Sequence, residues 1–473
     1  MHDLGVALNE IRSAWMAGRS ALNHCPSAWR EAASGPDGEC ALVAPAGHAT
    51  AVLFRPEPAS PITPSPVLPK LALPTLPESL RPRMRRMLAA QKNKGSIERA
   101  MVNFVAARGY VLHPGDWTPS PRDDWAPDPY APWLDWARDE YKPAPPPFAL
   151  ETYDQWSFAM RRIALVALRR EDPDAARAIV AAKASSEPAE RRVKLIEALE
   201  ERLSERDADL LESLVNDRAE RVQSLARAYL ARLGKPTEEA TLGAELAETL
   251  KVGPTGWLSR RRRLSIEALK AEPRERRRRE LFSLVSYANL CRAFGLAEDA
   301  VLQTAPVGAP DNLEAFAEMI ATTGSDRAVH LLFAQAMENR DFPLARLHPL
   351  SRRLPAKDRR AALPQILKRN AEMFGTSLAL MGGALGEAPL AALVGSPSFA
   401  ALQQAIETAS GEQIERFALH VNVEAALVRL GLLASSTAAE ALVARLSAIG
   451  LSSADPKLSL LIFNAALKPE TEP

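Results

Sequence analysis

Four side chains that could bind a zinc ion lie between residues 24 and 48. They are His24, Cys25, Cys40 and His48. Zinc sites favour ligands that are paired two to four residues apart on each side, whereas an adjacent His-Cys pair points its two side chains awkwardly toward one tetrahedral ion. The spacing therefore favours ordinary structural roles for these residues, and we expect neither a metal nor another cofactor.

The strongest local charge lies in residues 251–280, which carry 11 Lys and Arg against 4 Glu. Clustered arginines attract phosphate groups, so this segment could bind nucleic acid. It could also pair with an acidic protein surface, or be a solvated helix face. Trp257 is its one ring for base stacking, fewer than single-strand binders usually present. The candidate interaction residues here are Arg260, Arg261, Arg262, Arg263, Arg276, Arg277, Arg278 and Arg279.

A second candidate interaction surface is rich in tryptophan and proline. Residues 114–147 contain 10 of the 38 prolines, which favour an extended chain. Such a segment can lie across helices and insert aromatic side chains as anchors, either within the molecule or into a partner. The intramolecular arrangement is the more usual one. The anchors considered for a partner surface are Trp117, Trp133 and Trp136.

Patterns that mark common catalytic and cofactor sites are absent from the sequence. It contains no phosphate-binding G-x-x-x-x-G-K-[ST], no strand-led G-x-G-x-x-G and no G-x-S-x-G nucleophile elbow. The seven histidines lie in unrelated contexts. We therefore do not expect an enzyme. Because catalytic residues can converge from distant segments, an enzyme with an unrecognised site is kept as a third possibility.

Length and composition favour a folded chain of several domains or one extended repeat array. The 473 residues are 47% hydrophobic and 25% charged, and 59 Lys and Arg nearly balance 58 Asp and Glu. This balance implies no obligatory wrapping around nucleic acid or an anionic membrane. The most apolar long run, 376–395, is broken by Glu387 and Pro389, so we expect no membrane span.

The cysteines and the N-terminus bear on the cellular compartment. Three scattered cysteines do not suggest a disulfide framework, which favours a reducing environment. The first residues lack the basic region and apolar core of a secretory signal. We expect a cytoplasmic protein.

Residues 203–233 indicate the elements that must position these side chains. Apolar residues recur there at helical spacing in two short runs, around Leu211 and around Leu230. Asp217 can cap the second helix, and Ser204 with Asp207 can cap the first. Short amphipathic helices of this kind must stack on neighbours to be stable. The pattern favours an all-α, HEAT-like helical-repeat array, with an antiparallel bundle as the alternative.

Proline-rich segments and helical runs divide the chain. A small β-hairpin is expected at 40–54, with PAG as its turn. No fixed repeat period is visible, so any solenoid is degenerate. The expected regions are an N-terminal helical segment (1–34), a Pro-rich connection (35–82), a helix with the Trp/Pro-rich segment (83–150), HEAT-like repeats (151–250), a basic helical segment (251–310) and a C-terminal helical array (311–473).

The run KLIEALEERLSERDADLLESLVNDRAERVQSLARAYLARL resembles the bacterial family catalogued as domain of unknown function 5691. In that family a helix is followed by an LS-x-x-D step, a DLL helix, a DDR turn (NDR in this chain) and a helix ending LLARL. The resemblance is specific over about 150–235 and extends over 105–150. Genes of this family usually lie beside genes for MoxR-type AAA+ ATPases, von Willebrand factor A proteins and SWIM zinc-finger proteins.

The resemblance implies a helper of an ATPase machine, and it supplies no catalytic residue. Our leading hypothesis is therefore a non-catalytic interaction scaffold or adaptor that works with a MoxR-type ATPase and a von Willebrand factor A partner. The alternative is a nucleic-acid-associated helical-repeat protein that uses the arginines between residues 260 and 279.

Overall fold

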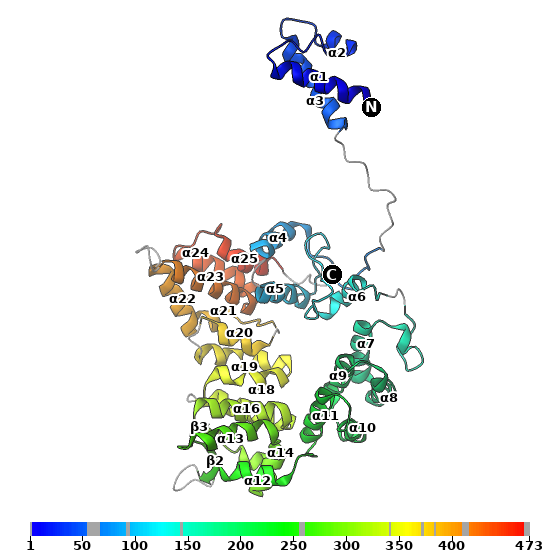
Figure 1. The fold of residues 1–473 in the computed structure, drawn as a ribbon. Helices are drawn as coiled ribbons and strands as arrows, with labels where there is room; N and C mark the ends of the chain where they lie inside the picture. The colour runs from blue at the N-terminus through cyan, green and yellow to red at the C-terminus, as the bar shows by residue number, and fades with distance from the viewer. Residues whose placement is uncertain are drawn as a thin grey trace, which may run out of the picture. The chain divides into compact units, whose positions relative to one another are not determined.

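Helices dominate the computed structural model, and one small sheet accompanies them (Figure 1). The structure describes residues 2–53, 67–90, 95–141, 145–254, 261–339, 342–369, 373–382, 385–408 and 416–467. The chain divides into two compact units, Met1–Val67 and Leu68–Pro473. Within the described ranges, no helix combines the length and apolar character needed to cross a membrane.

The described residues of the first unit form three helices. They are α1 (His2–Met16), α2 (Ser27–Ala32) and α3 (Gly38–Leu53). The hairpin predicted at 40–54 is wrong, because this segment is α3. Leu42, Ala46 and Ala49 are buried at spacings of four and three residues, which is a helical period rather than the alternation of a strand. Alanine also has the highest helix propensity.

The second unit begins with residues that pack against its last helices. This opening segment contains η1 (Glu78–Leu80), α4 (Arg81–Ala90), α5 (Gly95–Ala107), η2 (Asp128–Tyr130) and α6 (Ala131–Ala137). Its buried residues share one core with Leu385, Leu460 and Phe463. Arg108 also donates a hydrogen bond of 2.9 Å to the Asn464 side chain. The two ends of the second unit are therefore joined by apolar and polar contacts.

Short helices follow one another from residue 153 to residue 248. They are η3 (Tyr153–Gln155), α7 (Phe158–Glu171), α8 (Pro173–Lys183), η4 (Ala184–Ser186), α9 (Ala189–Glu197), η5 (Ala198–Arg202), η6 (Glu205–Asp207), α10 (Ala208–Leu214), α11 (Glu220–Arg232) and α12 (Ala240–Glu248). The predicted apolar runs do enter the core, where Leu211, Val222 and Leu230 are fully buried. The predicted cap at Asp217 is wrong: Ala219 is the N-cap residue of α11, and Asp217 accepts from the Ala219 amide in the turn before the helix.

Four ion pairs in this region join residues that are 31 or 32 positions apart in the sequence. Arg170 pairs with Glu201 and Arg221 with Glu190, each 31 residues apart. Arg206 pairs with Asp174, and Arg232 with Glu200, each 32 residues apart. The helices pack to match, because α9 contacts α11 and α7 contacts η5. Residues about 31 positions apart in the sequence thus lie side by side at these four contacts.

The basic segment contains strands, although 251–310 was predicted to be helical. Strand β1 (Lys251–Pro254) pairs antiparallel with β2 (Arg262–Ile266), which pairs parallel with β3 (Val307–Gly308). Leu264 and Ile266 are fully buried, while Ser265 between them is half-exposed. This alternation has the period of a strand and explains why a helical pattern is not formed there.

The remaining described helices complete the second unit. They are α13 (Glu272–Leu284), α14 (Tyr287–Phe294), α15 (Glu298–Val301), α16 (Pro310–Thr323), α17 (Asp326–Glu338), η7 (Leu344–Leu347), α18 (His348–Arg353), α19 (Ala356–Arg369), α20 (Gly375–Met381), α21 (Leu390–Val394), α22 (Pro397–Thr408), α23 (Arg416–Leu433), α24 (Ser436–Ala448), η8 (Pro456–Leu458) and α25 (Ser459–Ala466). Figure 1 shows α4 beside α25, which it contacts.

Candidate interaction surfaces

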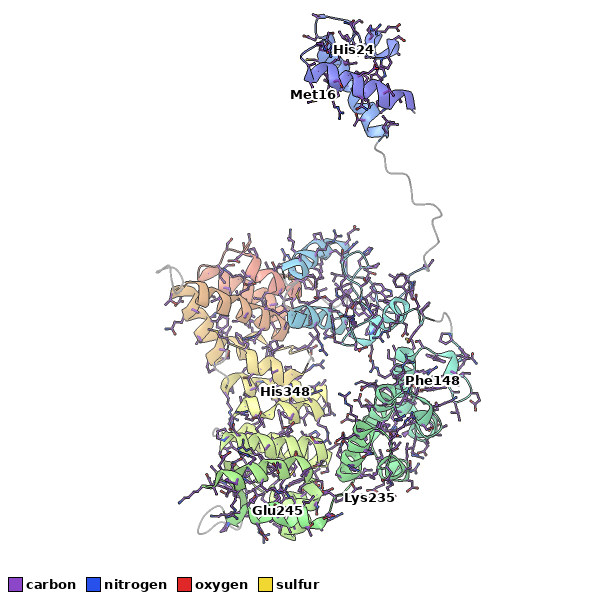
Figure 2. The ribbon with its side chains drawn as sticks, in the orientation of Figure 1. Met16, His24, Phe148, Lys235, Glu245 and His348 are labelled. Atoms are coloured by element: carbon purple, nitrogen blue, oxygen red, sulfur yellow. The ribbon has the colours of Figure 1, made fainter. Side chains whose placement is uncertain are left out.

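The four possible zinc ligands differ in their surroundings. Cys25 is buried in the small core of the first unit, and its thiol lies 3.3 Å from the carbonyl oxygen of Leu22. His24, labelled in Figure 2, is exposed, as are Cys40 and His48. In the part of the chain that the structure describes, no group of three or more His, Cys, Asp or Glu side chains could hold a metal ion.

The arginines of the basic segment are separated by the fold into buried and exposed groups. Arg278 was predicted as a surface residue, but it is fully buried. Its guanidinium contacts the Glu275 carboxylate at 2.5 Å and donates to the carbonyl of Glu267 at 2.9 Å. A third bond reaches the carbonyl of Thr249 at 3.3 Å. Arg278 therefore joins α13 to the end of α12 and to β2, and is not available to a partner.

Two further arginines on α13 have acidic partners. Arg277 binds both oxygens of Glu245, at 2.8 and 2.9 Å; Glu245 is labelled in Figure 2. This contact raises the pKa of Arg277 and lowers that of the Glu245 carboxyl. Arg279 pairs with Glu272 at 3.3 Å. The positive charge of α13 is thus partly neutralised by the protein itself.

The other arginines of the candidate set lie at the surface. Arg261, Arg262, Arg263 and Arg276 are exposed. The backbone of Arg262 is fixed by hydrogen bonds of 2.8 and 2.9 Å with the side chains of residues 303 and 304. Arg260 and Trp257 lie outside the described residues. The exposed basic surface is consequently smaller than the sequence count suggests.

The tryptophans of the Pro-rich segment pack largely within the molecule. Trp133 is 5% exposed and donates to the carbonyl of Pro69 at 2.7 Å. Trp117 is half-buried; it donates to Glu98 at 2.9 Å, and its ring meets Tyr130 edge-on with centroids 5.0 Å apart. Trp136 is also half-buried. Trp133 is therefore an anchor within the molecule. Trp117 and Trp136 keep only part of their side-chain surface exposed to solvent.

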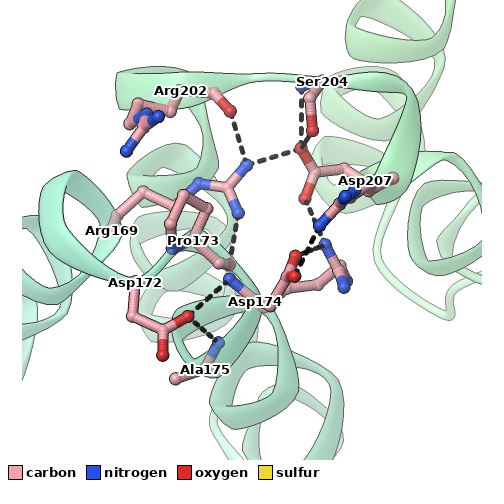
Figure 3. Close-up of polar contacts among 10 residues, drawn as sticks. Arg169, Asp172, Pro173, Asp174, Ala175, Arg202, Ser204 and Asp207 are labelled. Atoms are coloured by element: carbon pink, nitrogen blue, oxygen red, sulfur yellow. Dashed lines mark hydrogen bonds and ion pairs between the residues drawn. The ribbon is translucent and has the colours of Figure 1, made fainter.

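A buried ion pair that the sequence did not reveal holds the helices of residues 158–214 together. Arg169 and Asp207 are both fully buried, and their side chains meet at 2.5 Å (Figure 3). Arg169 also donates to the carbonyls of Pro173 and Arg202, at 2.7 and 2.8 Å. Asp207 accepts from the amide of Ser204 at 2.9 Å. The predicted capping residue Asp207 thus also pairs with Arg169. Local sequence does not indicate this contact, because the two residues are 38 positions apart.

A groove of about 710 Å³ lies where α11 meets α13 and α16. Its apolar lining includes Phe282, Met319 and Leu284. Leu284 is 54% exposed, more than any other large apolar residue among the described residues of the second unit. Two exposed acids, Glu220 and Glu318, also line the groove, and neither pairs with a described residue. Arg227 and Arg279 line the groove as well, so its charge is mixed. It can accept an apolar side chain, with a positive charge beside Glu220 or Glu318.

Comparisons with known proteins identify a family but no characterised relative. The family model described as a family of unknown function, DUF5691, matches residues 26–450. This match extends well beyond 105–235, where the resemblance is carried by sequence motifs. No curated protein and no solved structure matches the chain.

Proposed function

Since this chain belongs to the family of unknown function DUF5691, we propose that it is a non-catalytic scaffold or adaptor that binds other proteins. Its partners in this proposal are a MoxR-type AAA+ ATPase and a von Willebrand factor A protein, in the cytoplasm. Those two partners rest on the family resemblance alone. The interaction role rests on the geometry of the second unit.

The proposal includes a HEAT-like arrangement of the helices between residues 153 and 248. Its support is the ion-pair spacing of 31 and 32 residues, which recurs in Arg277 and Glu245 beyond that region. Repeats that stack in this way present continuous surfaces on which partners can lie. The spacing of 31 and 32 residues is found in the contacts between helices, whereas the residue types themselves do not repeat. For this reason no period is visible in the sequence.

The groove between α11, α13 and α16 is the single observation that carries the interaction role. Contact with a partner removes the exposed apolar area of Leu284 from water, and this contributes favourably to the binding free energy. We assign to the partner a segment with an apolar side chain that contacts Leu284 and a basic side chain near Glu220 or Glu318. Such central apolar anchors usually contribute most of the binding free energy.

The test is a pull-down of the tagged full-length protein from its own host, with and without nuclease, followed by mass spectrometry. We expect nuclease-resistant recovery of the ATPase or the von Willebrand factor A protein. Leu284→Glu should reduce this recovery at least about tenfold, because a charge then replaces the apolar anchor. Leu150→Glu is the matched control, since Leu150 is also exposed but lies outside the groove, and it should leave recovery unchanged.

Nucleic-acid association is a second candidate, favoured by the exposed Arg262, Arg263 and Arg276. In that case nucleic acid would be recovered and any proteins would be lost after nuclease treatment. Binding would weaken steeply with salt, because phosphate contacts release counterions. Recovery of neither proteins nor nucleic acid would contradict the scaffold proposal and would favour the third hypothesis, an enzyme with an unrecognised site.

A further inference from the structure

Helix α4 directs its four arginines into two separate environments. Arg81 and Arg85, one helical turn apart, both bind the carboxylate of Asp116, at 2.8 and 2.5 Å. Arg83 and Arg86 line a cavity of about 730 Å³ instead. Neither Arg83 nor Arg86 has a hydrogen-bond or ion-pair partner among the described residues. One pair of arginines is thus used by the fold, while the other pair faces the cavity.

The cavity lies between α4 and α5 on one side and α23 and α25 on the other. Apolar side chains from all four helices line it; they include Met87, Met101, Val428, Leu460 and Ile462. Methionine side chains adapt to irregular apolar shapes. Volume and lining both match small-molecule sites, which are mostly apolar with a few polar groups that fix orientation.

The charged groups of the cavity favour an anion. Lys457 adds a third positive charge to those of Arg83 and Arg86. One of the two carboxylates, Asp455, accepts from the amide of Lys457 at 2.9 Å and lies 3.6 Å from its ammonium group. Asp455 is therefore used in the turn before α25. Among the described residues that line the cavity, Glu424 alone remains to oppose the two arginines.

We propose that this cavity binds an anionic amphiphile, with a carboxylate head at Arg83 and Arg86 and an unbranched alkyl chain over the apolar lining. Guanidinium groups match the planar geometry of a carboxylate and can bind it through two parallel hydrogen bonds. Burial of the alkyl chain supplies the apolar part of the binding free energy. This ligand site is independent of the protein-interaction role proposed above.

The test is a fluorescence titration of the full-length protein with dansyl-undecanoate. We expect saturable binding of one probe per chain. Dodecanoate should displace the probe, whereas dodecylammonium, which has the same chain and the opposite charge, should not. High salt should weaken binding, since part of the attraction is electrostatic.

Variants locate the site and provide the control. Arg83→Gln with Arg86→Gln should weaken probe binding at least about tenfold, because the charge-assisted hydrogen bonds to the carboxylate are lost. Arg85→Gln is the matched control on the same helix; its side chain is 55% exposed and directed to Asp116, so affinity should not change. Ile462→Glu adds a carboxylate to the lining and should also weaken binding.

Three outcomes would overturn the proposal. They are unchanged affinity in the Arg83→Gln, Arg86→Gln variant, equal displacement by dodecylammonium, and no saturable binding of the probe. The absence of saturable probe binding would overturn the proposal even if an acidic peptide bound to Arg83 and Arg86. Circular dichroism of each variant excludes loss of folding as the cause of weaker binding.

Discussion

The helices of residues 158–232 and the basic segment 251–280 are both rich in arginine, yet they use it differently. In the first region Arg169 and Arg192 are buried and paired with Asp207 and Asp217. In the second, Arg278 is likewise buried and paired with Glu275, but Arg262, Arg263 and Arg276 are exposed. A high density of arginines in the sequence therefore does not by itself identify a binding surface. What matters is whether a neighbouring helix or strand supplies a carboxylate or carbonyl to each guanidinium.

The largest expected effect follows from breaking the buried pair. Asp207→Leu should lower the free energy of unfolding by about 3–5 kcal/mol, because Arg169 would remain buried without its charge partner. The measurement is urea unfolding followed by circular dichroism. A stability equal to that of the unmodified protein would contradict the structural role of this pair.

A double variant sharpens the same point. Arg169→Met with Asp207→Leu removes both buried charges and should recover most of the lost stability. If the double variant is as unstable as Asp207→Leu alone, the hydrogen bonds of Arg169 to the carbonyls of Pro173 and Arg202 matter more than the charge pairing.

An intermediate effect is expected from Asp116, which pairs with the two fold-stabilising arginines of α4. The hydrogen bond from Arg81 holds the pKa of this carboxyl below its ordinary value of 3.8. A depressed pKa in the folded state stabilises the protein above the unfolded-state pKa, and this contribution is lost as the pH falls through the folded-state pKa. Asp116→Asn should therefore be less stable than the unmodified protein near neutral pH, with a difference that shrinks in acid.

Thermal unfolding of both proteins across this pH range provides the measurement. A stability difference that stays constant from neutral to acidic pH would mean that the ionised Asp116 carboxylate is not the source of the effect.

The smallest effect is expected from the exposed arginines. Replacing Arg262, Arg263 and Arg276 together with Gln should leave the unfolding midpoint unchanged, since exposed charges contribute little to stability. Differential scanning fluorimetry is sufficient to check this. A clear fall in the unfolding midpoint would show that these arginines stabilise the fold, as Arg169 does.

Local sequence was informative where short-range physics determines the structure. The helical spacing around Leu211 and Leu230 and the bond from the Ser204 amide to Asp207 could be predicted because each depends on neighbouring residues. The strands at 251–266 could not, because β2 is stabilised partly by β3, about forty residues further on. Likewise, the burial of Arg278 and Arg169 could not be predicted from nearby residues alone, since Arg278 also bonds to Glu267 and Arg169 to Asp207, which lie in other elements.

The candidate surfaces show the same limit. Arginine and tryptophan content pointed to two candidate segments, but did not indicate which of their side chains remain exposed. Leu284 and the cavity of Arg83 and Arg86 were missed altogether, because each surface is assembled from helices far apart in the chain. Alternation of the α4 arginines between two sides could have been noticed, but their separate environments depend on Asp116 and on α25.

The contact between Arg108 and Asn464 has a consequence for synthesis of the protein on the ribosome. The two residues are 356 positions apart, so at about 5–20 residues per second the first waits roughly 20–70 s for the second. Met84, Val102 and Phe104, which share a core with the last helices, lack that cover throughout this interval. Chaperones that hold nascent chains are therefore expected to engage residues 68–133 before translation ends.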